Sequence, residues 1–170
     1  RLRKIGPPPG WRHLIGEIVW VQALSSNAVR GHDVEETAAL VFRFDNGVLG
    51  TFSLSDTVVA PWSWELTASE NPAYPPTGQS CYFIGGTHGS MELPNARLWS
   101  NQGKRSWWAP ISATRYPVGR EDPLVCQVMQ FARVIRGEEA PLVPASEGLK
   151  TLQVIDAVQR SAHSGEAVAL

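Results

Sequence analysis

The spacing of apolar residues changes once along this chain, and that change restricts the folds it can adopt. From residue 17 to about residue 108, apolar and polar side chains alternate in short runs, as in strands whose two faces differ. From Asp122 onward, apolar residues recur every three or four positions, as on one side of a helix. Strands followed by helices predict an α+β fold, with an open, mostly antiparallel sheet and two C-terminal helices packed on one face.

The strongest local signal is a hairpin. Residues 37–44 and 48–54 both alternate as strands do, and Asp45-Asn46-Gly47 lies between them. An Asn-Gly pair supplies the positive φ angles of a tight hairpin turn. Other runs of β-branched, aromatic or alternating residues predict further strands at 17–25, 62–69, 81–84, 90–93, 97–100 and 105–108.

Two helices are predicted in the last third of the chain. The first begins at Asp122-Pro123, a typical N-cap followed by a first helical residue, and ends at Gly137. The second is expected from about 146 to 163. Residues 167–170 are expected to add a short strand.

The domain organisation is interpreted from the proline-rich start of the sequence. Residues 6–10 read Gly-Pro-Pro-Pro-Gly, and three consecutive prolines remove three backbone donors and favour an extended chain. We therefore expect residues 1–16 to form an N-terminal extension without a helix. Residues 17–170 are expected to form a single α+β domain for substrate binding and oligomerisation.

Composition argues against several classes of partner. The formal net charge is −1, so we expect no basic surface for nucleic acid or an anionic membrane. No apolar run approaches the ~20 residues that cross a bilayer, and no signal sequence is recognised. Cys81 and Cys126 form neither a CxxC pair nor a disulfide framework, which favours a cytoplasmic location.

Tryptophan is unusually frequent, with seven residues in 170. A tryptophan is costly to leave exposed and often lies where an apolar surface meets a polar group. Two helices of about four turns cannot cover both faces of a sheet of roughly six to eight strands. We therefore expect the open sheet face to contact another copy in a homo-oligomer, or a neighbouring domain.

Motifs for cofactors and metals are not recognised. The glycine-rich run 85–89 precedes a predicted strand, so no helix N-terminus is directed at a phosphate there. The four histidines form no HxH or HxxxH pair, and the two cysteines add no metal-ligand spacing. We expect neither a cofactor site nor a metal site in this chain. His32, in a polar loop before the hairpin, is a candidate to reach a binding site.

Five segments, taken in order, carry a family resemblance. They are residues 15–23, 36–51, 85–93, 122–141 and 148–165. In this order they resemble the opening strand, the hairpin, the glycine–threonine turn and the two closing helices of one family. That family is the Gfo/Idh/MocA oxidoreductases (glucose–fructose oxidoreductase and inositol dehydrogenase), and the resemblance is to their C-terminal domain over about residues 14–170.

The resemblance implies a role for the parent protein. It implies a preceding Rossmann domain that binds NAD or NADP and carries a Glu-Lys-Pro motif, and neither is found in this chain. It also implies an Asp…His helix, but residues 1–12 lack the Asp and His13 does not fit the pattern, so no catalytic residue is assigned here. The implied reaction is hydride transfer between a sugar- or polyol-like carbon and the nicotinamide. We expect this chain alone to be inactive.

Candidate substrate-binding residues come from segments 62–65 and 70–74 and from the loop before the hairpin. Aromatic faces pack on the C–H faces of sugars, and nearby polar groups bind the hydroxyls. An alternative is that the two tryptophans fill the core between sheet and helices, which would direct Glu65 to solvent. The candidates are Trp62, Trp64, Glu65, Asn71, Tyr74 and His32.

Two other functions fit the same pattern. One is a non-enzymatic, Trp-rich sheet module that binds carbohydrate or assembles subunits, and it predicts ligand binding without a preceding domain. The other is a purely structural dimerisation domain.

Overall fold

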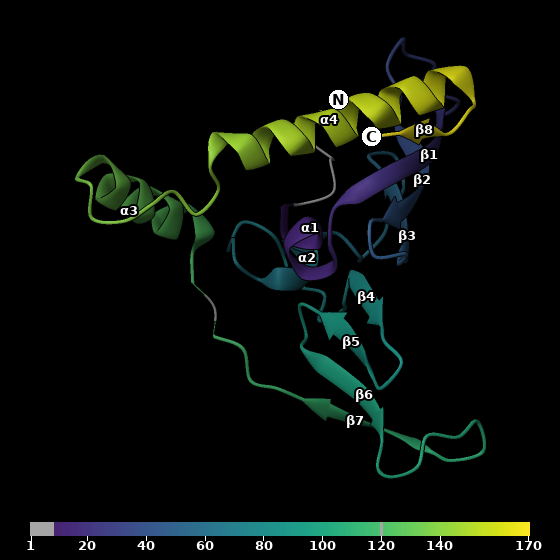
Figure 1. Cartoon of the computed structure of the whole chain (residues 1–170), viewed down its shortest axis with the longest axis vertical. Helices are drawn as coiled ribbons and strands as arrows, with labels where there is room; N and C mark the ends of the chain where they lie inside the picture. Colours follow the sequence, from purple (N-terminus) through teal and green to yellow (C-terminus); the bar gives the residue numbers. More distant parts are fainter. Residues whose placement is uncertain (1–8, 120) are drawn as a thin grey trace. The chain divides into compact units, whose positions relative to one another are not determined.

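The computed structural model describes residues 9–119 and 121–170 and confirms the α+β class. Its strands form two four-stranded antiparallel sheets, where the sequence predicted one. The chain divides into two compact units (Figure 1). Unit 1 combines the residues up to Val58 with Pro141–Leu170, and unit 2 comprises Val59–Ala140.

Unit 1 is a sheet in the order β3-β2-β1-β8 with α4 packed against it (Figure 1). The predicted hairpin is confirmed, with Thr37 opposite Ser55 and Arg43 opposite Leu49. The Asn46 side chain accepts a hydrogen bond from the Val48 amide at 3.1 Å and closes the turn. The elements are α1 (Pro9–Ile15), β1 (Ile18–Ser26), β2 (Thr37–Phe44), β3 (Leu49–Ser55), α4 (Ala145–Ser164) and β8 (Val168–Ala169).

The core of unit 1 lies between this sheet and α4. Alternate residues of β1 and β2 are buried, and Phe44 is only 1% exposed. The helix contributes Val154, Ala157 and Val158. The Ser161 hydroxyl accepts from the Ala23 amide at 2.9 Å and donates to the Glu166 carbonyl, so a polar bridge joins the helix end to the sheet.

The expectation that residues 1–16 contain no helix is wrong for residues 9–15, which form α1. A proline at the start of a helix removes only an N–H that would have no helical partner, so Pro9 is compatible with this position. Residues 1–8, where the rest of the predicted extension lies, are outside the described residues.

A buried arginine joins α1 to α4. The Arg12 side chain is 3% exposed, and its Nε lies 2.7 Å from Glu17 Oε2 while Nη2 lies 2.5 Å from Glu147 Oε2. Lys150 Nζ lies 2.8 Å from the other Glu17 oxygen. The hydrogen bonds from Arg12 and Lys150 lower the pKa of Glu17 to about 2.

Unit 2 is a sheet in the order β4-β5-β6-β7, with two further helices in the same segment. The predicted strands 81–84, 90–93 and 97–100 are confirmed within one or two residues. The elements are α2 (Trp64–Ala68), β4 (Tyr82–Gly85), β5 (Ser90–Leu93), β6 (Arg97–Asn101), β7 (Ile111–Arg115) and α3 (Pro123–Ile135).

The predicted strand 62–69 is wrong, because residues 64–68 form α2. The Ser63 hydroxyl caps this helix by accepting from the Leu66 amide at 3.2 Å. Thr67 and Ala68 are buried and Trp64 is half-buried, which is the i, i+3, i+4 spacing of a helix face. Over so few residues, this spacing and strand alternation are both present.

The predicted strand 105–108 is also wrong, since these residues lie in the loop before β7. The Ser106 hydroxyl accepts from the Trp108 amide at 3.2 Å, and the Ser106 carbonyl accepts from the Ala109 amide at 3.3 Å. These bonds form a turn instead of a ladder. They leave Trp107 100% and Trp108 95% exposed.

The two predicted C-terminal helices are confirmed, but they belong to different units. Asp122 caps α3 by accepting from the Leu124 amide at 2.9 Å, and α4 ends at Gly165 with a φ of 75°. The helix α4 packs on the first sheet. None of the residues of α3 is buried, and Phe131 is 63% exposed.

Candidate functional site

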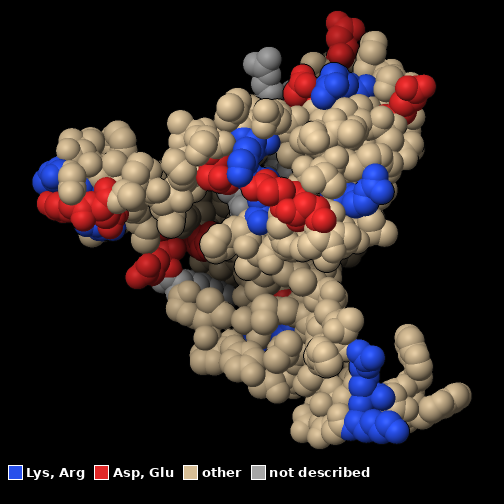
Figure 2. Space-filling model, viewed as in Figure 1, with Lys and Arg blue, Asp and Glu red and all other residues tan. Residues whose placement is uncertain are grey.

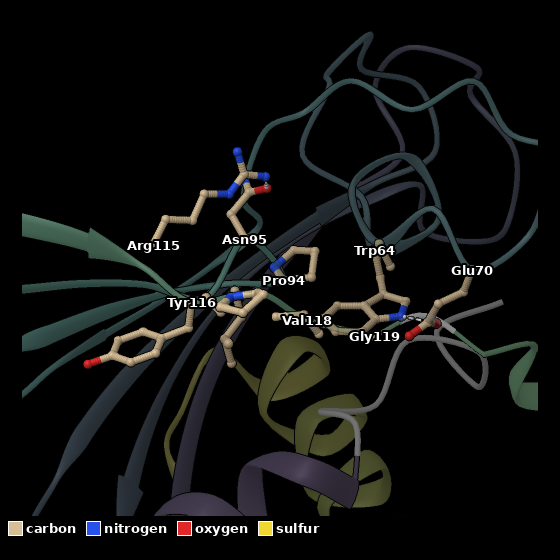
Figure 3. Close-up of a pocket in the computed structure, with 12 residues that line it drawn as sticks. Trp64, Glu70, Pro94, Asn95, Arg115, Tyr116, Val118 and Gly119 are labelled. Carbon is tan, nitrogen blue, oxygen red and sulfur yellow. Dashed lines mark hydrogen bonds between the residues drawn. The ribbon is translucent and has the colours of Figure 1, made fainter.

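Unit 2 contains an open hollow of about 560 Å³. Its walls come from α2 and the residues after it, the turn between β5 and β6, and the end of β7 with the segment that follows (Figure 3). The volume is within the range of small-molecule sites. The lining residues are Trp64, Ala68, Glu70, Leu93, Pro94, Asn95, Ala96, Arg115, Tyr116, Pro117, Val118 and Gly119.

One wall of the hollow is a tryptophan held in a fixed orientation. The Trp64 ring stacks on Tyr82, with centroids 5.4 Å apart and planes inclined by 24°. Its indole Nε1 donates to Glu70 Oε2 at 2.9 Å (Figure 3). An aromatic surface and a carboxylate acceptor therefore lie side by side.

The opposite wall is built on a buried asparagine. Asn95 is 7% exposed, and its Nδ2 donates to the Gly78 carbonyl and to the Ser80 hydroxyl, both at 3.0 Å. Its Oδ1 accepts from Arg115 Nη2 at 3.3 Å. Because both amide hydrogens are used, the asparagine oxygen is directed at the exposed Arg115 guanidinium.

The backbone beside Asn95 brings the end of β7 to this wall. Ala96 has a φ of 47°, in the left-handed region, and its carbonyl accepts from the Tyr116 amide at 3.0 Å. This bond extends the pairing of β6 with β7 beyond Arg115. It places Arg115 and Tyr116 on the hollow.

Of the tryptophan segment predicted to bind substrate, Trp64 alone lines the hollow. Its neighbour Glu65 is exposed in the first turn of α2 and does not line it. Trp62 is 61% exposed, outside the lining. Neither tryptophan belongs to the apolar core cluster of the described residues, so the core-filling alternative does not describe them.

The other predicted residues do not line the hollow either. Asn71 is exposed, and its side chain accepts from the Ala73 amide at 2.9 Å. Tyr74 is 43% exposed. His32 is an exposed loop residue of unit 1, and its carbonyl accepts from the Asn27 side chain. The predicted set is thus not assembled around this hollow.

Sequence reasoning missed three of the residues that shape the hollow. Asn95 lies in the short turn between β5 and β6, and Arg115 and Tyr116 end β7, which was predicted in the wrong place. The available signal was the predicted pairing of neighbouring strands, which brings strand ends together. Glu70, by contrast, begins the 70–74 loop that the sequence singled out.

A dinucleotide does not fit the described residues. The glycine-rich turn joins β4 to β5, and Gly86 donates to the Gly89 carbonyl at 2.9 Å across it. A phosphate cradle needs such a turn to enter a helix. Both long helices instead begin beside acidic groups, Asp122 at α3 and Glu147 at α4.

Neither a metal-binding cluster nor a membrane-spanning helix is present in the part of the chain that the structure describes. In it, no group of three or more His, Cys, Asp or Glu side chains could hold a metal ion. None of its helices combines the length and apolar character needed to cross a membrane. Figure 2 shows acidic and basic side chains mixed over the viewed face, with a basic group at the end of the β6–β7 hairpin, where the loop carries Lys104 and Arg105.

The chain matches the C-terminal alpha/beta domain of an oxidoreductase family, Gfo/Idh/MocA, over residues 10–170. It belongs to this family, as the resemblance of its five segments implied. A search of curated proteins gave no significant match.

Solved structures share the fold at low sequence identity. An aldose-aldose oxidoreductase from Caulobacter crescentus, complexed with glycerol, is 21% identical with a TM-score of 0.66, covering 95% of this chain and 44% of that one. The WlbA dehydrogenase from Bordetella pertussis, in complex with NADH and UDP-GlcNAcA, is 18% identical with a TM-score of 0.61, covering 95% and 41%. An oxidoreductase from Agrobacterium radiobacter, in complex with NAD+, L-tartaric acid and magnesium, is 16% identical with a TM-score of 0.62, covering 94% and 45%.

The chain spans less than half the length of these three structures. They share the fold of this chain. The ligands named above are bound in those three proteins.

Proposed function

We propose that this chain is the substrate-binding domain of an NAD- or NADP-dependent oxidoreductase that acts on a sugar- or polyol-like substrate. The hollow of unit 2 is the part of the substrate pocket that this chain contributes. A preceding Rossmann domain binds the nicotinamide cofactor and supplies the catalytic residues. The chain by itself is inactive, because it has no place for the cofactor among its described residues.

The observation that carries this proposal is the pairing of Trp64 with Glu70. An indole face packs on the C–H groups of a polyol, and an adjacent carboxylate accepts from its hydroxyls. Tyr82 and Glu70 hold the ring, so little side-chain freedom is lost on binding. The glycerol and UDP-GlcNAcA of two structural neighbours agree with a polyhydroxylated ligand.

A titration of the chain with myo-inositol and D-glucose, followed by NMR, tests the binding role. We expect saturable shifts of the Trp64 indole signal, and their loss in Trp64→Ala. Trp107→Ala is the matched control, because Trp107 is a fully exposed tryptophan of the same unit outside the hollow. Equal effects of the two variants would contradict the proposal.

The enzymatic role is tested in the parent protein that contains this chain. Oxidation of polyols should be coupled to reduction of NAD or NADP, and Trp64→Ala should raise KM. Polyol binding without any coupled nicotinamide turnover would favour the non-enzymatic carbohydrate module instead.

Homo-oligomerisation is proposed through the face of the first sheet that α4 does not cover. That face carries Leu24, Val41 and Leu49, which are 66%, 42% and 71% exposed. Exposed apolar side chains on one sheet face are typical of an interface. The molar mass measured by light scattering should be that of a dimer or a larger oligomer, and Leu49→Glu should lower it toward that of the monomer. A monomeric parent protein at high concentration would contradict this part.

The preceding domain and a cytoplasmic location complete the proposal. The apolar side chains of α3 are exposed, as expected of a helix that contacts another domain. Both cysteines are free, which agrees with a reducing compartment.

A further inference from the structure

We infer that the hollow of unit 2 recognises an anionic polyol, a sugar acid or a sugar phosphate, through the guanidinium of Arg115. This inference rests on the proposed function and gives its substrate a charge. It places an anion-binding group at one end of the hollow and a hydroxyl acceptor at the other.

Arg115 is positioned for this role by a buried neighbour. Asn95 directs its oxygen at Nη2 of Arg115, and its own amide is fixed by the Gly78 carbonyl and the Ser80 hydroxyl. One of five guanidinium N–H donors is thereby used. The other four have no partner among the described residues, so a planar fork remains for two anionic oxygens.

The charge of Arg115 is also uncompensated within its sheet. Glu92, Arg97 and Arg115 lie opposite one another across β5, β6 and β7, and therefore on one sheet face. Glu92 is already bound, because Oε1 accepts from the Trp99 indole at 2.6 Å and Oε2 lies 3.6 Å from Arg97 Nη1. The single carboxylate of this row thus pairs with Arg97 and not with Arg115, and like charges on directly opposite residues destabilise a sheet. A bound anion at Arg115 would relieve this repulsion.

The wall formed by Trp64 and Glu70 sets the orientation of the ligand in the hollow. Figure 3 shows Glu70 and Trp64 on one side of Pro94 and Val118, and Arg115 with Asn95 on the other. A second anionic group beside Glu70 would be repelled, whereas a hydroxyl would be bound. The polyol therefore lies with its acidic end at Arg115 and its hydroxyls at Glu70, against the Trp64 ring.

Isothermal titration of the chain with three probes tests this inference: D-glucuronate, D-glucose 6-phosphate and D-glucose. We expect at least one anionic sugar to bind about tenfold more tightly than glucose, as for a charge-assisted bidentate contact. The anion that binds more tightly identifies the sugar acid or the sugar phosphate as the source.

Variants assign the preference to one side chain. Arg115→Gln should remove the preference for the anion, and Arg115→Lys should restore part of it, because the charge returns without the fork. Arg105→Gln is the matched control, since Arg105 donates to the Thr87 carbonyl and does not line the hollow. It should leave all three affinities unchanged.

The outcomes separate this inference from the proposed function. Equal affinities of the chain for glucose and both anions would overturn the role of Arg115 and leave the polyol site standing. An anion preference that persists in Arg115→Gln would overturn it too. Binding of none of the three probes would overturn both. If Arg115→Gln did not fold, the comparison of the probes on the unaltered chain would decide.

Discussion

In the described part of the chain, both units bury three polar residues, which in unit 1 are Arg12, Glu36 and Ser161, but they differ in how many apolar side chains they bury. In unit 1 the buried cluster is apolar and continuous, from Ile18 on β1 to Val158 on α4. In unit 2 the buried residues of the described chain are Ala68 and three polar residues, Thr67, Ser80 and Asn95. The first unit is thus stabilised by removal of apolar surface from water, and the second depends more on hydrogen bonds.

This difference matters for the candidate site. The walls of the hollow lie in unit 2, where side-chain orientation is set by paired polar groups instead of close apolar packing. Hydrogen bonds are directional, so they fix the orientation of Asn95 and Arg115 while adding little stability. Substitutions in the two units should therefore have effects of different kinds.

The largest difference should come from two phenylalanines. Phe44 on β2 is 1% exposed, and Phe83 on β4 is 67% exposed. Phe44→Ala should lower the free energy of unfolding by about 3–5 kcal/mol, because it removes buried surface and leaves a cavity. Phe83→Ala should change it by no more than about 0.5 kcal/mol. Urea unfolding of both variants measures this, and similar losses would show that the units do not differ in this way.

A smaller loss is expected when the buried polar network of unit 2 is broken. Asn95→Ala leaves the Ser80 hydroxyl without its partner and releases Arg115, at a cost of about 1–3 kcal/mol. Asn71→Ala is the control, because Asn71 is exposed and bonds only a neighbouring amide, so a change within about 0.5 kcal/mol is expected. Hydrogen exchange of β5 and β6 amides reports the loss in unit 2. Unchanged exchange in Asn95→Ala would mean that the network contributes nothing.

Alanine substitution of the glycine that follows each long helix should lower stability by a similar amount in both units. Gly165 after α4 and Gly137 after α3 have φ angles of 75° and 74°, and a Cβ on either would meet nothing within 4 Å. Alanine at each should cost about 1 kcal/mol through the backbone alone. Gly148→Ala, inside α4 with open space around it, should instead add roughly 0.5–1 kcal/mol of stability. Thermal unfolding compares the three, and a destabilised Gly148→Ala would contradict the backbone explanation.

The smallest effect should be the acid dependence of unit 1. The pKa of Glu17 falls from an ordinary value of 4.5 to about 2 on folding. Its contribution is therefore present above about pH 4.5 and is lost as the pH falls toward 2. Glu17→Gln should make stability less dependent on pH across this window in urea titrations. Glu138→Gln is the control, because Glu138 pairs with Arg136, only two residues away, and joins no separate elements. An equal flattening in both variants would contradict a role for the Arg12 cluster.

Much of the fold was predictable from local pattern. The Asn46-Gly47 turn, the Asp122 cap and the stop at Gly165 each depend on a few adjacent residues, and each is confirmed. The segment from Trp62 to Ser69 was mispredicted because strand and helix periods coincide over so short a run. There the Ser63 cap decided the structure.

The site was less predictable, because its residues meet only through pairing of strands. Trp64 was predicted because aromatic faces pack on sugars, and Glu70 lies in the 70–74 loop that the sequence also predicted to bind substrate. Asn95 and Arg115 are 20 positions apart and carry no local motif that connects them. Their approach depends on the register of β6 with β7, and the sequence predicted this last strand at 105–108, six residues before the start of β7.

Unit 1 is assembled from two stretches of chain that the whole of unit 2 separates. During synthesis on the ribosome, β1–β3 emerge long before α4, which supplies Val154, Ala157 and Val158 to their core. The nascent sheet must therefore wait with its apolar face uncovered, a state in which chaperones bind, while unit 2 can already form. Closing a contact such as that of Arg12 with Glu147 across so many residues makes folding slow relative to a helical bundle of similar size.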